Sequence, residues 1–164
     1  MPQIHDFMKK YFCLLLPVFL LASCTEDVKF NNPAFQSLKD NVFWRAQNYS
    51  AHVETSGIVV IQGSLGYEKV TFRLPSSSPQ TYILGVDDSS VATYSNTLPS
   101  QLAEFSTGTN KGSGQIIVTD YNAEAQTISG TFRFNAVNRD EGNPEKPGIS
   151  FTEGVFYKIP ISPN

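Results

Sequence analysis

Cysteine is almost missing from this chain. The 164 residues include two cysteines, and both of them, Cys13 and Cys24, lie within the first 24 positions. The residues after Cys24 therefore offer no disulfide, no thiolate nucleophile and no thiolate ligand for a metal. A domain built from them must be stabilised by its hydrophobic core alone, which is ordinary for a chain of this length.

Histidine is nearly as scarce, because the chain has two, His5 and His52. A Ser-His-acid triad would have to use His52 as its base, and no serine lies in a Gly-x-Ser-x-Gly sequence. Zinc catalysis usually requires several His, Asp or Glu ligands around one ion. The sequence therefore predicts no catalytic residue, no metal site and no cofactor, and we expect a protein that is not an enzyme.

Clustered positive charge is also missing. The chain has 12 basic and 15 acidic side chains, which gives a formal net charge of −3, and the basic residues are scattered. Proteins that bind nucleic acid neutralise its phosphates with grouped Lys and Arg side chains. We therefore expect no nucleic-acid partner.

Long apolar runs are limited to one, Tyr11 to Leu21, which follows Met8-Lys9-Lys10 and ends in Leu21-Ala22-Ser23-Cys24. A basic start, a short apolar run and small residues before the cleavage point are the parts of a signal peptide. The run is too short for a comfortable permanent membrane span. The four closing residues resemble the lipobox of bacterial lipoproteins.

This motif predicts how the mature chain begins. Residues 1–23 are expected to form a signal helix, cleavage separates Ser23 from Cys24, and Cys24 receives the lipid. Met8 is the expected true start, because residues 1–7 place an acidic side chain ahead of the two lysines. Several acyl chains on one cysteine hold a soluble domain at a membrane almost permanently.

The residues after the cysteine predict the destination. Thr25 stands where an aspartate would mark retention at the inner membrane in enteric bacteria, so we expect delivery to the outer membrane. Thr25-Glu26-Asp27 also resembles the short acidic tag of surface-exposed lipoproteins of the Bacteroidetes. The periplasmic face and the cell surface both remain open. Residues 24–33 are expected to form a polar tether, and the acyl chains are the predicted contact with the membrane.

From residue 34 onwards the dominant pattern has a period of two residues. Thr127–Ala136 alternates apolar and polar side chains, and Val70–Leu74 does the same, which is typical of half-buried strands. Ile58–Ile61 is apolar throughout, which predicts a central strand covered on both faces. Short polar segments separate the apolar runs and indicate hairpins, and Asp40-Asn41 is one such break between two short runs.

We therefore predict a single antiparallel all-β domain over residues 34–164. It should contain about nine or ten short strands, arranged as a β-sandwich or as a flattened barrel.

The C-terminal half contains three segments that read as one series: Gly112-Ser113-Gly114-Gln115-Ile116-Ile117-Val118-Thr119, Thr127-Ile128-Ser129-Gly130-Thr131-Phe132-Arg133-Phe134-Asn135-Ala136, and Ile149-Ser150-Phe151-Thr152-Glu153-Gly154-Val155-Phe156. They resemble a family of uncharacterised Bacteroidetes lipoproteins, the DUF6252 type. Asn41-Val42-Phe43-Trp44-Arg45-Ala46 stands in the place of that family's tryptophan strand. The resemblance covers residues 34–160. It implies a lipoprotein of this class, without a known activity or active site.

Glu153 is the carboxylate that fits a simple strand least well. Strict alternation from Ile149 to Ile161 points it to the same face as Phe151 and Val155, where an unpaired charge is costly. Either Gly154 marks a β-bulge that resets the phase, which we favour, or Glu153 is an interior polar site with an arginine partner. The candidate partners are Arg45, Arg73 and Arg133.

Two further patterns have a structural and a functional interpretation. Asp87-Asp88 and Asp120-x-Asn122-x-Glu124 offer clustered oxygens to calcium, but Asp and Asn also stabilise turns, and we favour turns.

Trp44, in phase with Val42 and Ala46, is predicted to lie in the core. Other aromatic side chains could stack on a glycan if they are exposed, although a core role is favoured for them as well. They are Tyr49, Tyr67, Tyr82, Tyr94, Tyr121, Phe43 and Phe156.

These observations predict a lipid-anchored cell-envelope domain that binds a protein or a glycan without catalysing a reaction. A first alternative is a closed barrel that holds a small apolar ligand in a cavity lined by Phe132, Phe134 and Tyr157. A second is a hydrolase that uses two carboxylates about 5–10 Å apart in a cleft. A structural role in an envelope assembly is the third.

Overall fold

The computed structural model describes residues 34–140 and 146–162. The predicted signal helix, the cleavage site at Ser23 and Cys24, and the tether of residues 24–33 lie outside the described residues. The described chain forms eleven β-strands and one short 3-10 helix, η2 (Pro99–Gln101), so the predicted all-β fold is confirmed. Within these residues no helix is long and apolar enough to cross a bilayer.

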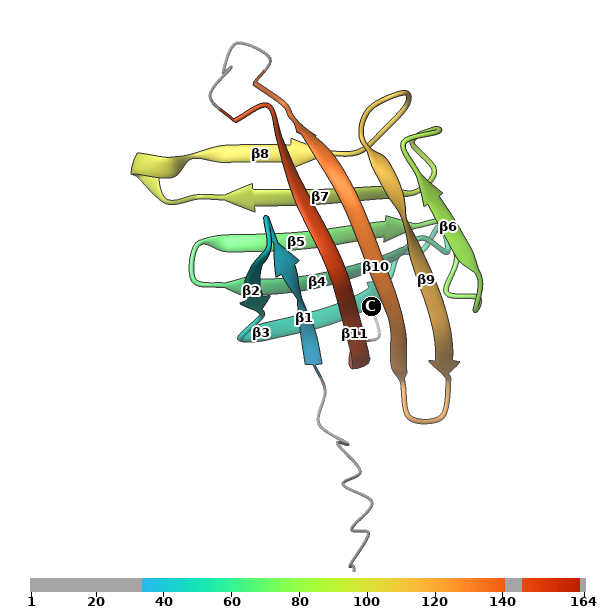
Figure 1. Cartoon of the computed structure of the whole chain (residues 1–164). Helices are drawn as coiled ribbons and strands as arrows, with labels where there is room; N and C mark the ends of the chain where they lie inside the picture. The colour runs from blue at the N-terminus through green and yellow to red at the C-terminus, as the bar shows by residue number, and fades with distance from the viewer. Residues whose placement is uncertain (1–33, 141–145, 163–164) are drawn as a thin grey trace, which may run out of the picture. The chain divides into compact units, whose positions relative to one another are not determined.

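The strands form two layers that cross at a steep angle (Figure 1). The first layer has the order β3-β4-β5-β7-β8, and the second has the order β2-β1-β11-β10-β9-β6. The strands of the first layer are β3 (Asn48–Val53), β4 (Val59–Leu65), β5 (Glu68–Leu74), β7 (Val91–Asn96) and β8 (Ala103–Ser106). Those of the second are β1 (Ala34–Lys39), β2 (Val42–Arg45), β6 (Thr81–Leu84), β9 (Ser113–Asn122), β10 (Thr127–Asn138) and β11 (Gly148–Ser162).

Two long strands join the layers by strand pairing. The end of β10 pairs with β8, where Val137 lies opposite Ser106, and the end of β11 pairs with β3, where Ile161 lies opposite Ala51. Because β10 and β11 also pair with each other, seven strands form a closed hydrogen-bonded ring: β11, β3, β4, β5, β7, β8 and β10. The domain is thus a barrel flattened into a sandwich with strands that turn its corners.

The odd number of strands in this ring explains a departure from the predicted antiparallel sheet. Strands around a closed ring can alternate in direction throughout only when their number is even, so a ring of seven needs a parallel pair. That pair is β11 with β3, and every other strand pair is antiparallel.

The β1–β2 hairpin shows how local sequence sets the fold. Asp40 and Asn41 form its two-residue loop, with φ angles of 49° and 65°. Two successive positive φ angles are typical of a type I′ turn, whose twist matches that of the flanking strands, and Asp and Asn tolerate this conformation. The predicted break between the two apolar runs is therefore the hairpin turn.

Aromatic rings fill the space between the layers. The ring of Phe72 on β5 lies 5.5 Å from Phe35 on β1 and 4.7 Å from Phe132 on β10, and Phe134 stacks on Phe151 at 4.7 Å. Phe132 and Phe134 thus contact other rings at the place where the closed-barrel alternative put a ligand. The predicted cavity is wrong at these residues, because close-packed side chains occupy it.

Two β-bulges shift the phase of β11. Against β10, Phe132 lies opposite Gly154 and Phe134 opposite Phe151, so β11 has one residue more than its partner between these pairs. A second irregularity lies near Lys158, whose φ is 48°. Each bulge moves the following side chains to the other face of the sheet.

The bulges overturn two predicted orientations. Val155 and Tyr157 were expected to face inward, but the first bulge turns them outward and leaves them half-buried. Phe156 is fully buried, which confirms the favoured core role, and its ring lies 6.2 Å from that of Phe72. Tyr157 therefore does not line the interior.

Candidate functional site

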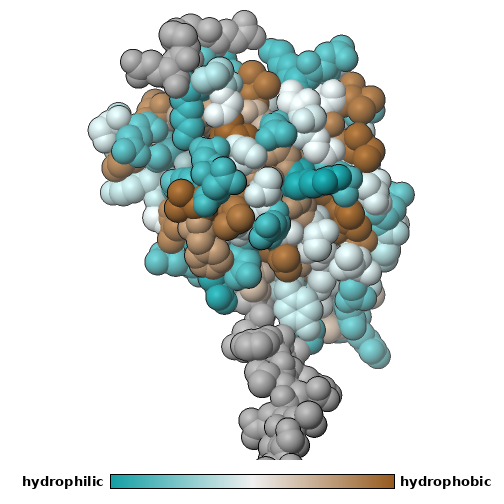
Figure 2. All heavy atoms as spheres, in the orientation of Figure 1, coloured by the Kyte–Doolittle hydropathy of each residue, from teal (hydrophilic) through white to brown (hydrophobic). Residues whose placement is uncertain are grey.

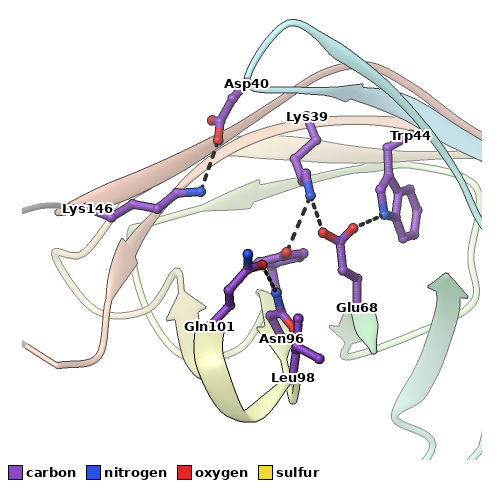
Figure 3. A network of polar contacts seen from close by, with 9 residues as sticks. Lys39, Asp40, Trp44, Glu68, Asn96, Leu98, Gln101 and Lys146 are labelled. Atoms are coloured by element: carbon purple, nitrogen blue, oxygen red, sulfur yellow. Dashed lines mark hydrogen bonds and ion pairs between the residues drawn. The ribbon is translucent and has the colours of Figure 1, made fainter. Parts of the chain in front are cut away.

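Side chains, not strand pairing, connect the β1–β2 hairpin to β5 and β7 of the first layer (Figure 3). Glu68, the first residue of β5, forms an ion pair with Lys39 at the end of β1 and accepts a hydrogen bond from Trp44 Nε1 at 2.6 Å. Lys39 Nζ also lies 3.5 Å from the hydroxyl oxygen of Tyr94 on β7. We call these four residues the end cluster. They attach the hairpin to the opposite layer.

The electrostatics of the end cluster favour an ionised Glu68. Partial burial opposes ionisation, but the Lys39 ammonium and the hydrogen bonds from Lys39, Tyr94 and Trp44 outweigh it and hold the pKa of Glu68 below its ordinary value. Burial and the nearby Glu68 charge raise the pKa of Tyr94, so its hydroxyl stays protonated. The carboxylate already has partners from both layers, which suits it to joining them.

Apolar side chains surround the end cluster at the surface. A depression of about 560 Å³ adjoins it, and Tyr94 and Lys146 are among its lining residues. Lys146 Nζ lies 3.4 Å from Asp40 Oδ2 in the hairpin turn. Four large apolar side chains on the segments that bear the end cluster or line this depression are 61–74 % exposed: Val42, Phe43, Tyr67 and Leu102. We call these four the apolar rim, and the surface over β1 and β2 in Figure 2 is correspondingly brown.

A second polar site lies on the outward face of the second layer, over β9, β10 and β11. Two neighbouring depressions of about 310 and 350 Å³ lie there, and Gln115 and Arg133 line both of them. We call the two depressions together the outer trough. Its outward side chains are Ser113, Gln115, Ile117, Thr131, Arg133, Asn135, Thr152, Glu153 and Val155. In Figure 2 this face mixes teal and white side chains with isolated brown ones.

The strand alternation predicted for Thr127–Ala136 places three of these side chains. Thr131, Arg133 and Asn135 are exposed on β10, while the residues between them are buried. Arg133 Nη2 donates a long hydrogen bond of 3.5 Å to Gln115 Oε1 on β9. Among the described residues no ion pair includes Arg133. Most of its N–H donors therefore have no acceptor among the described residues.

The first bulge of β11 brings Glu153 into the same trough. Glu153 has a φ of 52° and an exposed side chain, so the predicted bulge is confirmed and the interior polar site is wrong. Gly154 takes the inward position, and a Cβ there would lie 2.5 Å from the Phe132 ring. Because the interior has room for glycine alone at this point, the charged neighbour is turned outward.

Arg133 and Glu153 lie in one depression but do not form an ion pair with each other. Sequence reasoning connected these two residues as partners in the interior. The structure brings them together on the outside instead, because β11 has an extra residue opposite β10 at this point.

The other candidate ligands have structural roles in the described chain. Asp87 Oδ1 accepts a hydrogen bond from the Ser89 backbone N–H at 2.9 Å, and Asn122 Oδ1 accepts one from Ala125 at 2.7 Å. The favoured turn role is confirmed for these two residues. No group of three or more His, Cys, Asp or Glu side chains that could hold a metal occurs among the residues described. His52 is half-buried on β3.

The candidate aromatic residues divide between surface and core. Phe43, Tyr67 and Tyr121 are exposed, whereas Tyr82 and Tyr94 are buried. Trp44 is 2 % exposed and packs edge-on against Phe151, with ring centroids 6.2 Å apart, so its predicted core position is confirmed. None of the three exposed rings lines the outer trough, so aromatic stacking does not define that site.

A family model described as a domain of unknown function, DUF6252, matches residues 31–160. The chain belongs to this family. The DUF6252 match includes every strand from β1 to most of β11, and with them the end cluster and the outer trough. No curated protein and no solved structure matches the chain. The site must therefore be interpreted from its own geometry.

Sequence reasoning missed Glu68. It stands 29 positions from Lys39 and 24 from Trp44, so no local pattern connects the three residues. One signal was available, because a tryptophan predicted to be buried needs an acceptor for its indole N–H. That signal predicts an acceptor near Trp44, but it does not identify Glu68.

Proposed function

We propose that this chain is a lipid-anchored outer-membrane protein whose β domain binds a ligand in the outer trough and does not act as an enzyme. The observation that carries the proposal is the bulge at Glu153, which presents an exposed carboxylate next to Arg133. A non-glycine residue in the left-handed region is costly and persists where the surrounding structure enforces it. Bulges of this kind often re-aim a side chain next to a binding site.

The charges in the trough support ligand binding. Surface ion pairs between neighbouring strands are common and inexpensive, yet Arg133 and Glu153 stay apart in the same depression. Both groups therefore keep hydrogen-bonding capacity for a third molecule. A concave surface that combines apolar lining with a few convergent polar groups is the usual form of a small-molecule site.

The lipid anchor is proposed on sequence grounds. Leu21-Ala22-Ser23-Cys24 closes a basic and then apolar segment, and Thr25 follows it. A domain held by acyl chains at Cys24 would carry its binding site on the periplasmic or the outer face of the envelope. Ten residues, 24–33, separate the lipid from the first strand. They can extend about 35 Å at most, which keeps the domain close to the membrane.

A second candidate function is favoured by the apolar rim. Val42, Phe43, Tyr67 and Leu102 expose apolar surface around polar groups that are already paired in the end cluster. Apolar surface framed by polar residues is typical of protein-protein contacts. This end of the domain therefore suits a partner protein in an envelope assembly.

The proposed site can be tested by its accessibility in the envelope. Cys13 and Cys24 are the natural cysteines, so a cysteine introduced at Thr131 would be the reactive thiol of the mature domain. We expect Thr131→Cys to react with a maleimide more slowly in isolated envelopes than in the purified protein, because a ligand occupies the trough. Adding Arg133→Met to this variant should restore fast labelling by removing the ligand contact.

Ser50→Cys provides the matched control, since Ser50 is exposed on β3 in the first layer, away from the trough. Its labelling rate should be the same in envelopes and in the purified protein. Equal rates for Thr131→Cys in both preparations would show that the trough is empty in the envelope, and would contradict the proposal.

A further inference from the structure

We infer that the outer trough takes a neutral oligosaccharide, an assignment that rests on the ligand-binding function proposed above. The decisive feature is one positive and one negative side chain, Arg133 and Glu153, that share a depression without pairing. An anionic ligand is attracted by Arg133 but repelled by Glu153, and a cationic ligand meets the reverse, so neither gains a net attraction from the pair. A neutral ligand avoids both penalties.

Hydroxyl groups match this pair of charges. A carboxylate only accepts hydrogen bonds and a guanidinium only donates them, whereas a hydroxyl does both. Two neighbouring hydroxyls on a sugar ring can donate to Glu153 and accept from the planar fork of Arg133 at the same time. Gln115, which lies in both depressions, adds an amide that donates and accepts.

The length of the trough points to more than one sugar unit. Thr131, Arg133 and Asn135 form an outward row on β10, and alternate residues of a strand are separated by about 7 Å. The row thus extends over roughly 13 Å, longer than a single sugar ring. Ile117 and Val155 line one of the two depressions and offer apolar surface to the C–H faces of such rings.

The strand pairing argues against a peptide in the same place. Peptides commonly bind sheets by adding a strand to a free edge. At the trough β9 lies between β10 and β6, β10 lies between β9 and β11, and β11 lies between β10 and β1. The backbone of these strands is therefore already paired, and recognition must use side chains.

The test uses the full lipidated chain in a zwitterionic, sugar-free detergent. Its probes are neutral tetrasaccharides of glucose, mannose and N-acetylglucosamine, a tetragalacturonate as the acidic probe, and capped tetra-alanine as the peptide. We expect at least one neutral tetrasaccharide to shift the backbone amide NMR signals of Gln115, Arg133 and Glu153. The tetragalacturonate and the peptide should leave these signals unchanged.

Two variants connect the binding to the charges. Glu153→Asn keeps a residue that tolerates the left-handed conformation, and Arg133→Met keeps most of the side-chain length. Each should weaken binding of the active tetrasaccharide about tenfold or more, since a charged hydrogen-bonding partner is lost. Glu104→Gln, on β8 outside the trough, should have no effect, and unchanged thermal unfolding confirms that each variant is folded.

Three outcomes would overturn the inference: no neutral tetrasaccharide shifts these signals, binding persists in both trough variants, or the acidic probe binds in place of the neutral ones. Shifts caused by the peptide alone would reject the oligosaccharide while leaving the trough as a binding site. Fast labelling of Thr131→Cys in envelopes would instead reject the proposed function itself.

Discussion

Glu153 has a backbone conformation that its side chain does not favour. Its φ is 52°, and an L-residue other than glycine usually loses about 1–2 kcal/mol in the left-handed region. The conformation follows from the next residue, because Gly154 must face the Phe132 ring where a Cβ would approach to 2.5 Å. The strain at Glu153 is therefore set by the aromatic interior.

This strain predicts the effect of two substitutions. Glu153→Val should lower the free energy of unfolding by about 1–2 kcal/mol, because a branched side chain tolerates positive φ poorly. Glu153→Gly should change it by less than about 1 kcal/mol, because relief of strain offsets the greater freedom of glycine in the unfolded chain. Urea unfolding followed by tryptophan fluorescence measures both.

Glu104→Val is the matched control, because Glu104 is an exposed strand residue and is not one of the non-glycine residues with a positive φ. It should change the free energy of unfolding by less than about 1 kcal/mol, because it removes an exposed ion pair with Arg139 and introduces no backbone strain. If valine is tolerated equally well at positions 153 and 104, the bulge is not strained and the argument for its role in binding loses its basis.

At the scale of elements, the β1–β2 hairpin depends on contacts with the other layer. It pairs with β11 through β1, and its tip is attached to β5 and β7 by the end cluster. Glu68 is the centre of this attachment, since it pairs with Lys39 and accepts the indole hydrogen bond of Trp44. Removing its charge should therefore loosen the hairpin as a unit.

Glu68→Gln should lower the free energy of unfolding by about 1–3 kcal/mol at neutral pH, because Lys39 loses a part-buried charged partner. Glu54→Gln removes the carboxylate from a comparable but more exposed pair with Arg73, and should cost less than about 1 kcal/mol. Equal losses in the two variants would show that the end cluster contributes no more than a surface ion pair.

The effect of Glu68 should also depend on pH. Its folded-state pKa is below the ordinary value, so its contribution is fully present above the unfolded-state pKa and is lost as pH falls through the folded pKa. Urea midpoints of the wild type and Glu68→Gln should therefore differ at neutral pH and converge once the pH has fallen through the folded-state pKa of Glu68. A difference that persists unchanged in acid would contradict the assigned ionisation.

The proposed location of the whole molecule depends on Cys24, which lies outside the described residues. Cys24→Ala should move the protein from the membrane pellet to the soluble fraction, because the acyl chains are the proposed anchor. Cys13→Ala alters the other cysteine, within the apolar run of the signal, and should leave the protein in the pellet. Membrane retention of Cys24→Ala would refute the lipid anchor.

At the scale of the whole molecule, the closure of the strand ring could not be predicted from local sequence patterns. The alternation in Thr127–Ala136 correctly predicted β10 and its outward row, and Asp40-Asn41 correctly predicted a turn. The pairing of β11 with β3 closes the ring and is its parallel pair. The order of apolar and polar side chains within each strand does not predict this pairing. A local pattern extends over about ten residues, so it cannot indicate a contact between strands that lie more than 100 residues apart in the sequence.

The sequence by itself determined the strand-rich class, the core position of Trp44, the turn roles of Asp87 and Asn122, and membership of the DUF6252 family, because period, turn chemistry and motif are local properties. It also identified Glu153 as the residue that a regular strand could not accommodate. Tertiary structure decided its direction, because the extra residue in β11 exists only relative to β10 and β1. The same non-local pairing placed Glu153 next to Arg133, and so created the outer trough.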